Sequence, residues 1–278
     1  MTDTASLAED FEALGVRPGA VLLVHASLRR VGAAPETVLE ALRRAVGQEG
    51  TVVVPTFTAG NSDTSPAYRA RTRNMAVDQL GAYRRQMPPF EVNRTPSEGM
   101  GRLAEAVRCA PGRARSTHPQ TSFAAVGASA AELLAVHDED CHLGERSPLA
   151  SLDAAGAQVL LLGVGFEVCS AFHLGEYRVL APPQRTYRCV VLRDGVRRWT
   201  SYEDVDLDDS DFGALGAEFE KDDAKRSSPV ILGGSVGATH ARLFPLGAAV
   251  EFATGWLAGN RRIRPSTDTS QIAAGFLH

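Results

Sequence analysis

The sequence predicts an α/β protein in which helices flank a mixed central sheet. Residues 1–57 follow the order strand, helix, strand, which is the order of a parallel crossover unit. Residues 158–162 form the most apolar strand-like run of the chain. Later, Asp194-Gly195 separates two further strand-like runs and is a strong hairpin signal. A parallel unit and an antiparallel pair in one chain together predict the mixed sheet.

The first elements are defined by short apolar runs and their boundaries. Residues 20–24 are apolar and follow Gly19, so we expect a buried strand. Pro35 opens a helix and Gly47 stands where its C-terminal cap belongs. The apolar residues at helical spacing between them are Val38, Leu39, Leu42, Ala45 and Val46. Residues 51–54 follow as a second buried strand.

The middle of the chain alternates polar stretches with further elements. Region 59–93 is polar without a sustained apolar period, so we expect a partly helical surface excursion of the kind that often carries binding function. Helices are expected over 100–108 and 130–136. The apolar run at 158–162, which ends in a glycine-containing turn, is expected to be a central strand.

The C-terminal half is expected to add antiparallel strands at 188–192 and 196–200. The segment 203–225 is acidic, and a helix is expected near 248–257, ahead of a polar tail that we expect to be loose. No repeat or low-complexity segment divides the chain. We therefore expect one domain over 1–278.

Composition excludes several function classes. A net charge of -4 gives no basic footprint for nucleic acid. No apolar run approaches the roughly 20 residues of a membrane span, and the N-terminus is polar and acidic. The four cysteines are too sparse for a disulfide scaffold, so we expect reduced thiols. Together these features predict a cytoplasmic protein that binds neither nucleic acid nor membrane.

A candidate catalytic pair follows the most apolar strand, where α/β sheets place ligands. If this stretch is helical, His173 and Glu176 lie on one face, so the carboxylate can orient the imidazole as a base. Such a histidine is suited to take up a proton near neutral pH. Spacing alone also fits an ordinary helix with one polar face.

Three other stretches have ligand-binding chemistry. Residues 25–30 combine a hydroxyl, backbone amides and two arginines just after the first strand, which suits phosphate and amide groups. Residues 95–102 offer capping residues and glycines that permit close approach of a ligand. Residues 115–123 include His118, which is more often structural than a base. A solvated loop explains the first stretch equally well, and a plain capped helix is the favoured explanation of the second when it is taken alone.

Other patterns do not meet the requirements of known sites. Gly163-x-Gly165 lacks the third glycine and the helix of a dinucleotide fingerprint, and the glycines at 233–237 do not follow a convincing buried strand. The histidines, acidic residues and cysteine at 137–142 lack zinc-ligand spacing. We expect a polar loop there and no metal.

Taken together, six blocks in order resemble the aminoglycoside 3-N-acetyltransferase family, also called the antibiotic N-acetyltransferase family. They cover most of the chain. The blocks are VLLVHASLRRVG at 21–32, GTVVVPTFT at 50–58, TPSEGMGRLAEAVR at 95–108, RSTHPQTSFAAVG at 115–127, HLGERSPLASL at 142–152 and VLLLGVGFEVCSAFHLGEYR at 159–178.

The resemblance implies an α/β fold distinct from that of GNAT acetyltransferases, acetyl-CoA as donor, and direct transfer to an amine. It places His173 as general base, Glu176 as the carboxylate that orients it, and Ser170 where the family usually has a threonine that stabilises the tetrahedral intermediate. The positions on blocks associated with CoA in similar proteins are Ser27, Leu28, Arg29, Ser97, Met100, Gly101 and Arg102.

Alternatives remain open at this stage. Cys169 stands four residues before His173 and could act as a nucleophile in an acyl-enzyme mechanism. A non-catalytic CoA-binding protein is a third reading. The acceptor is a small-molecule amine, with an aminoglycoside as one candidate and another amine as the alternative. Whether Asp63 or the acidic stretch 203–211 faces the cleft is left open, and a homodimer is allowed.

Overall fold

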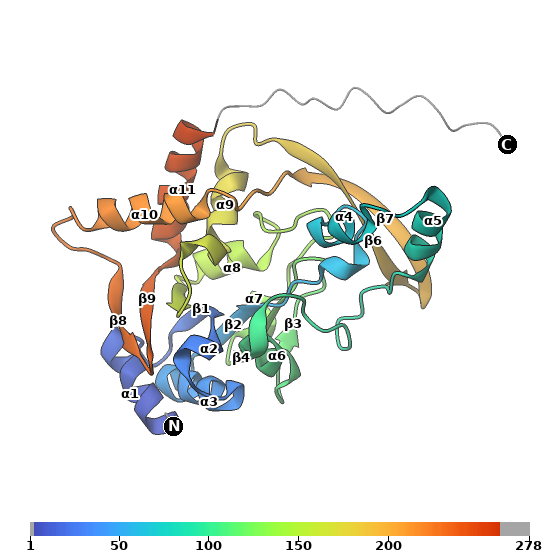
Figure 1. Cartoon of the computed structure of the whole chain (residues 1–278). Helices are drawn as coiled ribbons and strands as arrows, with labels where there is room; N and C mark the ends of the chain where they lie inside the picture. Colours follow the sequence, from blue (N-terminus) through green and yellow to red (C-terminus); the bar gives the residue numbers. More distant parts are fainter. Residues whose placement is uncertain (1–2, 262–278) are drawn as a thin grey trace.

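The computed structural model describes residues 3–261, and residues 262–278 of the expected loose tail lie outside them (Figure 1). The strands are β1 (Val21–Ala26), β2 (Thr51–Pro55), β3 (Ala114–Arg115), β4 (Phe123–Gly127), β5 (Gln158–Leu162), β6 (Gln184–Arg193), β7 (Val196–Val205), β8 (Leu232–Val236) and β9 (Thr239–Pro245).

The helices are α1 (Thr4–Leu14), α2 (Leu28–Val31), α3 (Pro35–Val46), α4 (Pro66–Thr72), α5 (Val77–Gln86), α6 (Gly101–Cys109), α7 (Ala130–Leu133), α8 (Pro148–Ala154), α9 (Ala171–Arg178), α10 (Phe212–Asp223) and α11 (Leu246–Asn260). Two short 3-10 turns, η1 (Ala59–Asn61) and η2 (Phe166–Val168), complete the list of described elements.

The central sheet has seven strands in the order β3-β4-β2-β1-β5-β9-β8. Strand β1 lies in its middle and pairs in parallel with both β2 and β5, with His25 opposite Leu161 of β5. All the other pairs are antiparallel. The expected crossover from β1 through α3 to β2 and the expected mixed sheet are confirmed.

Alternating side chains along β1 divide the core into two layers. Leu22 and Val24 pack with α1, α3 and α6 on one face of the sheet. Leu23 points to the other face and packs with α8, α9, α10 and α11. Because successive side chains of a strand point to opposite faces, one strand contributes to both cores.

Strands β6 and β7 form a separate two-stranded sheet that extends away from the central one, beside α4 and α5 (Figure 1). Asp194 and Gly195 both have positive φ, as a tight hairpin turn requires, so this hairpin prediction is confirmed. Its strands are longer than expected. The region 59–93 is partly helical as expected, but Asn61 and Asp63 within it are buried and contact β6.

Several elements were missed or misjudged in the sequence. Helix α1 was not expected, although its buried face is apolar and Asp3 caps it. Helix α10 lies inside the segment expected only to be acidic, and the helix expected over 130–136 ends at Leu133. Residues 233–237 lie in β8 and the turn to β9, because the edge strand is specified by its partner more than by its own glycine-rich sequence.

The close contact between α10 and η2 yields a stability prediction. A Cβ at Gly216 would lie 2.0 Å from Phe166 Cβ, so Gly216→Ala should lower the free energy of unfolding by about 1–3 kcal/mol through overpacking. Urea denaturation followed by circular dichroism measures this. Gly213→Ala, in the same helix with open space around the new Cβ, is the matched control and should cost nothing. Equal stability of the two variants would contradict the described packing.

Candidate active site

A cavity of about 580 Å³ lies at the carboxyl ends of the parallel strands β1, β2 and β5. Its walls come from the residues after β1, from the start of α6, from the β5–α9 connection and from the start of α10. The chain leaves β1 towards α3 on one face and leaves β5 towards α9 on the opposite face. Connections that diverge in this way open a crevice, which is where open α/β sheets bind ligands.

The expected pair is present at the start of α9. His173 lines the cavity, and its Nδ1 lies 2.6 Å from Oε2 of Glu176. Because Nδ1–H donates to this carboxylate, Nε2 is left to accept a proton. The imidazole also packs on Phe212, whose ring centre lies 4.7 Å away. The orientation of the histidine is therefore fixed from two sides.

Glu176 is buried and held by three partners. Besides His173, its carboxylate accepts hydrogen bonds from the backbone N–H of Asp208 at 3.0 Å and from the guanidinium of Arg261. Arg261 also pairs with Asp211. A buried carboxylate needs such pairing to remain charged. The second oxygen is thus satisfied independently of His173.

Ser170 and Cys169, which precede α9, differ sharply in access. Ser170 lines the cavity. Cys169 is fully buried in the apolar core, and burial raises the pKa of its thiol to about 12. A nucleophilic cysteine must be both accessible and readily ionised. The structure therefore argues against the acyl-enzyme alternative.

Most of the expected cofactor-binding residues meet at the cavity. Six of them line it: Ser27, Leu28, Arg29, Met100, Gly101 and Arg102. Gly101 has φ of +82° at the start of α6, a conformation that favours glycine. Ser97 does not line the cavity. Its backbone N–H donates to Glu105 at 2.7 Å and its hydroxyl is buried.

Three arginines line the same cavity, and they differ in the contacts that they make. Arg30 donates to the carbonyl of Gly163 at 2.9 Å and so ties the end of β1 to the end of β5. Arg29 and Arg102 are exposed and have no ion-pair or hydrogen-bond partner within residues 3–261. Two unpaired guanidiniums beside a cavity suit a phosphate-bearing ligand.

Among the described acidic residues, two line the cavity. Asp209 and Glu167 line it. Asp63 is buried and paired with Arg84 and Arg188, so its charge is already used. Within the acidic stretch, only Asp209 lines the cavity, because the other acidic side chains point elsewhere.

Sequence reasoning missed several residues of the site. Tertiary packing brings Asp208 and Arg261 to Glu176 and Phe212 to His173, and no local spacing links these residues. His25 lies in the stretch 25–30 that was expected to bind a ligand, but no role was predicted for the histidine itself. A signal existed for it, because His25 is a polar residue inside an otherwise apolar strand run.

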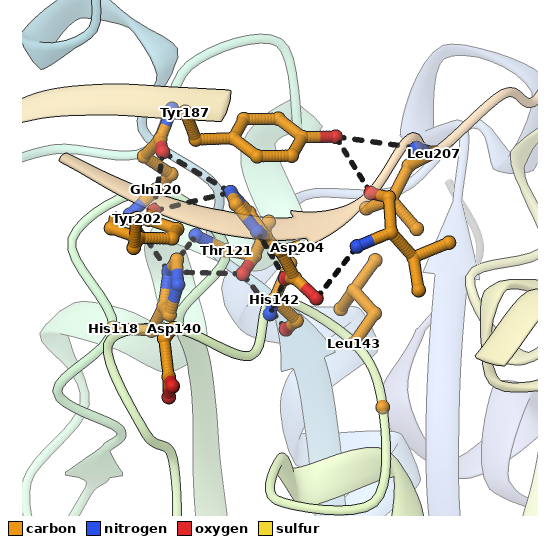
Figure 2. Close-up of polar contacts among 12 residues, drawn as sticks. His118, Gln120, Thr121, Asp140, His142, Leu143, Tyr187, Tyr202, Asp204 and Leu207 are labelled. Atoms are coloured by element: carbon orange, nitrogen blue, oxygen red, sulfur yellow. Dashed lines mark hydrogen bonds and ion pairs between the residues drawn. The ribbon is translucent and has the colours of Figure 1, made fainter. Parts of the chain in front are cut away.

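Beside the site, a buried polar network joins the loops that precede β4 and α8 to the β6–β7 hairpin (Figure 2). Asp204 of β7 accepts hydrogen bonds from the backbone N–H of His142 at 2.7 Å and from the Tyr177 hydroxyl at 2.6 Å. His142 Nδ1 lies 2.7 Å from the same carboxylate, and its Nε2 faces Gln120 and Tyr202. Tyr177 adjoins Glu176 in sequence, so this network also helps to fix helix α9.

Burial controls ionisation in this network. It lowers the pKa of His137 to about 3 and also lowers the pKa of His142. Burial acts to raise the pKa of Asp204, but hydrogen bonds from His142 and Tyr177 outweigh it and lower that pKa. The histidines are thus neutral at pH 7 and the carboxylate is charged.

Two further findings concern residues 3–261 as a whole. No helix there is long and apolar enough to cross a membrane. The same residues contain no group of three or more His, Cys, Asp or Glu side chains placed to hold a metal ion.

Comparison with known proteins gives one consistent family. The sequence profile described as aminoglycoside 3-N-acetyltransferase matches residues 23–258. The SPbeta prophage-derived aminoglycoside N(3')-acetyltransferase-like protein YokD of Bacillus subtilis is 35% identical over 261 residues, covering 92% of each chain. Aminoglycoside N(3)-acetyltransferase VII of Streptomyces paromomycinus is 37% identical over 266 residues, covering 90% of each.

Solved structures agree with the sequence comparison. The crystal structure of YokD superposes with a TM-score of 0.85 at 32% identity, covering 94% of this chain and all of that one. The structure titled AAC-IIIb binary with CoASH gives a TM-score of 0.79 at 30% identity, covering 93% of this chain and 97% of that one.

The buried histidines predict that stability falls in mild acid. Unfolded histidines take up protons near pH 6.5, whereas His137 in the fold stays neutral to about pH 3. Lowering the pH from 7 to 5 therefore favours the unfolded chain, by about 1–2 kcal/mol for each such histidine. Urea denaturation at a series of pH values measures this.

The matched variants test the same histidines. His137→Gln should give a shallower loss of stability between pH 7 and pH 5 than the wild type. His240→Gln, at an exposed position, should keep the wild-type slope. A wild-type stability equal at the two pH values would show that the network histidines are not neutral in the fold.

Proposed function

The chain belongs to the aminoglycoside 3-N-acetyltransferase family, and we propose that it transfers an acetyl group directly from acetyl-CoA to the 3-amino group of an aminoglycoside. The observation that carries this proposal is the His173–Glu176 pair at the wall of the cavity. The pair offers a free Nε2 to the cavity and a buried, charged partner behind it. This is the arrangement that a general base requires.

A protonated amine is not a nucleophile, so the acceptor reacts as the neutral amine after one proton has passed to solvent, and the base is needed for the second proton, which leaves during the attack. His173 Nε2 takes the amine proton as the nitrogen attacks the acetyl carbon, and Glu176 stabilises the imidazolium that forms. The carbon–nitrogen bond forms, the carbon–sulfur bond breaks, and the electron pair of the latter goes to sulfur. The proton held by His173 can then pass to the sulfur. Ser170 is suited to donate a hydrogen bond to the carbonyl oxygen as negative charge develops there.

The described residues fit acetyl-CoA as the donor. The cavity combines two unpaired arginines, Arg29 and Arg102, with the N-terminal end of α6, where backbone N–H groups are free to bind anions. Acetyl-CoA supplies the activated acetyl group as a thioester. The AAC-IIIb structure, similar over most of this chain, contains CoASH.

Negatively charged side chains in the cavity support an aminoglycoside as the acceptor. Aminoglycosides are polycations, and cavities that bind them need carboxylates. Asp209 and Glu167 line the cavity near His173 and are exposed to it. The relative from Streptomyces paromomycinus is named for transfer to an aminoglycoside N(3) position.

The catalytic pair gives the first kinetic prediction. His173→Gln should lower kcat/KM by about 10²–10⁴-fold, the usual contribution of a general base. Glu176→Gln should lower it less, because the base survives without its charged partner. Free thiol release from acetyl-CoA with a panel of aminoglycosides, amino sugars and other primary amines measures both.

Cys169→Ser is the matched control and should retain activity. Loss of activity in this variant would support the acyl-enzyme alternative, in which His173 would serve as the partner of Cys169. Turnover of another amine with no aminoglycoside accepted would contradict the proposed acceptor while leaving the chemistry intact.

The two unpaired arginines give the second kinetic prediction. Arg29→Ala and Arg102→Ala should each raise KM for acetyl-CoA by about 10- to 100-fold, the value of one charge-assisted hydrogen bond to phosphate. With S-acetylpantetheine, which lacks the nucleotide phosphates, the same substitutions should have no effect. Arg94→Ala, at an exposed residue that does not line the cavity, is the control. An equal loss with both thioesters would show that these arginines do not bind phosphate.

A further inference from the structure

His25 is a buried histidine inside the central strand of the sheet. It is the penultimate residue of β1, it is 6% exposed, and it lines the same cavity as His173. Its neighbours along the strand, Val24 and Ala26, are apolar. The proposed acetyl transfer, as set out above, assigns no role to this side chain.

The Nε2 atom of His25 is buried and has no hydrogen-bond partner among residues 3–261. A buried polar atom left in this state destabilises the fold. Other described residues also have such an atom, but among those that line the cavity only His25 does. By contrast, both ring nitrogens of His137 are hydrogen-bonded. The missing partner of His25 is therefore expected to enter through the cavity.

The chemistry of the neighbouring residues limits what this partner is. The amine must give its proton to an acceptor, and His173 already supplies one. The developing negative charge on the thioester oxygen needs donors. His25 lies two residues before Ser27, which begins the stretch suited to hold the donor substrate. Its position therefore favours the thioester over the amine.

Charge supports the same assignment. Burial, and then the proximity of His173, lower the pKa of His25 to about 4, so its imidazole is neutral at pH 7. A neutral imidazole can donate a hydrogen bond from its N–H group without placing a positive charge beside His173. His173 must itself become positive when it takes up the amine proton. A lysine or arginine at this place would oppose protonation of His173.

We infer that His25 is a further catalytic residue, whose Nε2–H donates a hydrogen bond to the carbonyl oxygen of the bound thioester, beside Ser170. This inference rests on the proposed acetyl transfer. His25 forms no covalent bond and gives up no proton in this role. It stabilises charge only while that charge is on oxygen.

The kinetic test compares two substitutions. His25→Phe keeps a ring but removes the donor, and should lower kcat by about 10²–10³-fold, the usual effect of losing one such donor. KM for acetyl-CoA should change little. His25→Gln keeps an N–H group and should recover part of the lost kcat. A kcat within threefold of wild type in His25→Phe would overturn the inference.

Two readouts separate this role from a structural one. His25→Phe removes an unpaired polar atom, so its urea midpoint at pH 7 should not fall below that of the wild type. Infrared difference spectra of bound acetyl-CoA, labelled with carbon-13 at the carbonyl, should show the stretch at higher frequency in His25→Phe than in wild type. An unchanged band would overturn the inference even if activity fell.

The same measurements distinguish failure of the inference from failure of the proposed function. Wild-type protein that neither binds acetyl-CoA in calorimetry nor releases thiol with any amine would overturn both. Wild-type turnover together with wild-type behaviour of His25→Phe would overturn the role of His25 alone.

Discussion

The parallel pairing of β1 with β2 and β5 is the constraint on which the site depends. Parallel strands end at one edge of a sheet, so three separate stretches of sequence finish at the same place. The helices that follow β1 and β5 leave to opposite faces, and this divergence opens the cavity between them. Residues as distant as Ser27 and His173 meet for that reason.

A second requirement is the burial of charge beside the cavity. The Glu176 carboxylate is shielded from water, so its partners must be supplied by the protein. They come from α9 itself, from the segment before α10 and from the residue after α11. Helices α10 and α11 thus contribute to the site through polar residues that flank them, Asp208 before α10 and Arg261 after α11.

The central elements and the contact between His173 and Glu176 could be predicted from the sequence, because their signals are local. Apolar runs identified β1, β2 and β5, and a spacing of three residues placed His173 beside Glu176. Elements specified by their partners were missed, such as the glycine-containing edge strand β8. Arg261 was missed because its pairing with Glu176 spans 85 residues, and no motif encodes a contact of that range.

His173 and Glu176 are carried on a single turn of one short helix, held on one side by the core and on the other by the network around Asp204. The imidazole and its carboxylate partner are therefore positioned together by the same helix. The strand ends and loops that surround the ligands are separate segments with their own contacts. Substitutions in those segments can thus change which ligands are recognised without disturbing the geometry of the His173–Glu176 pair.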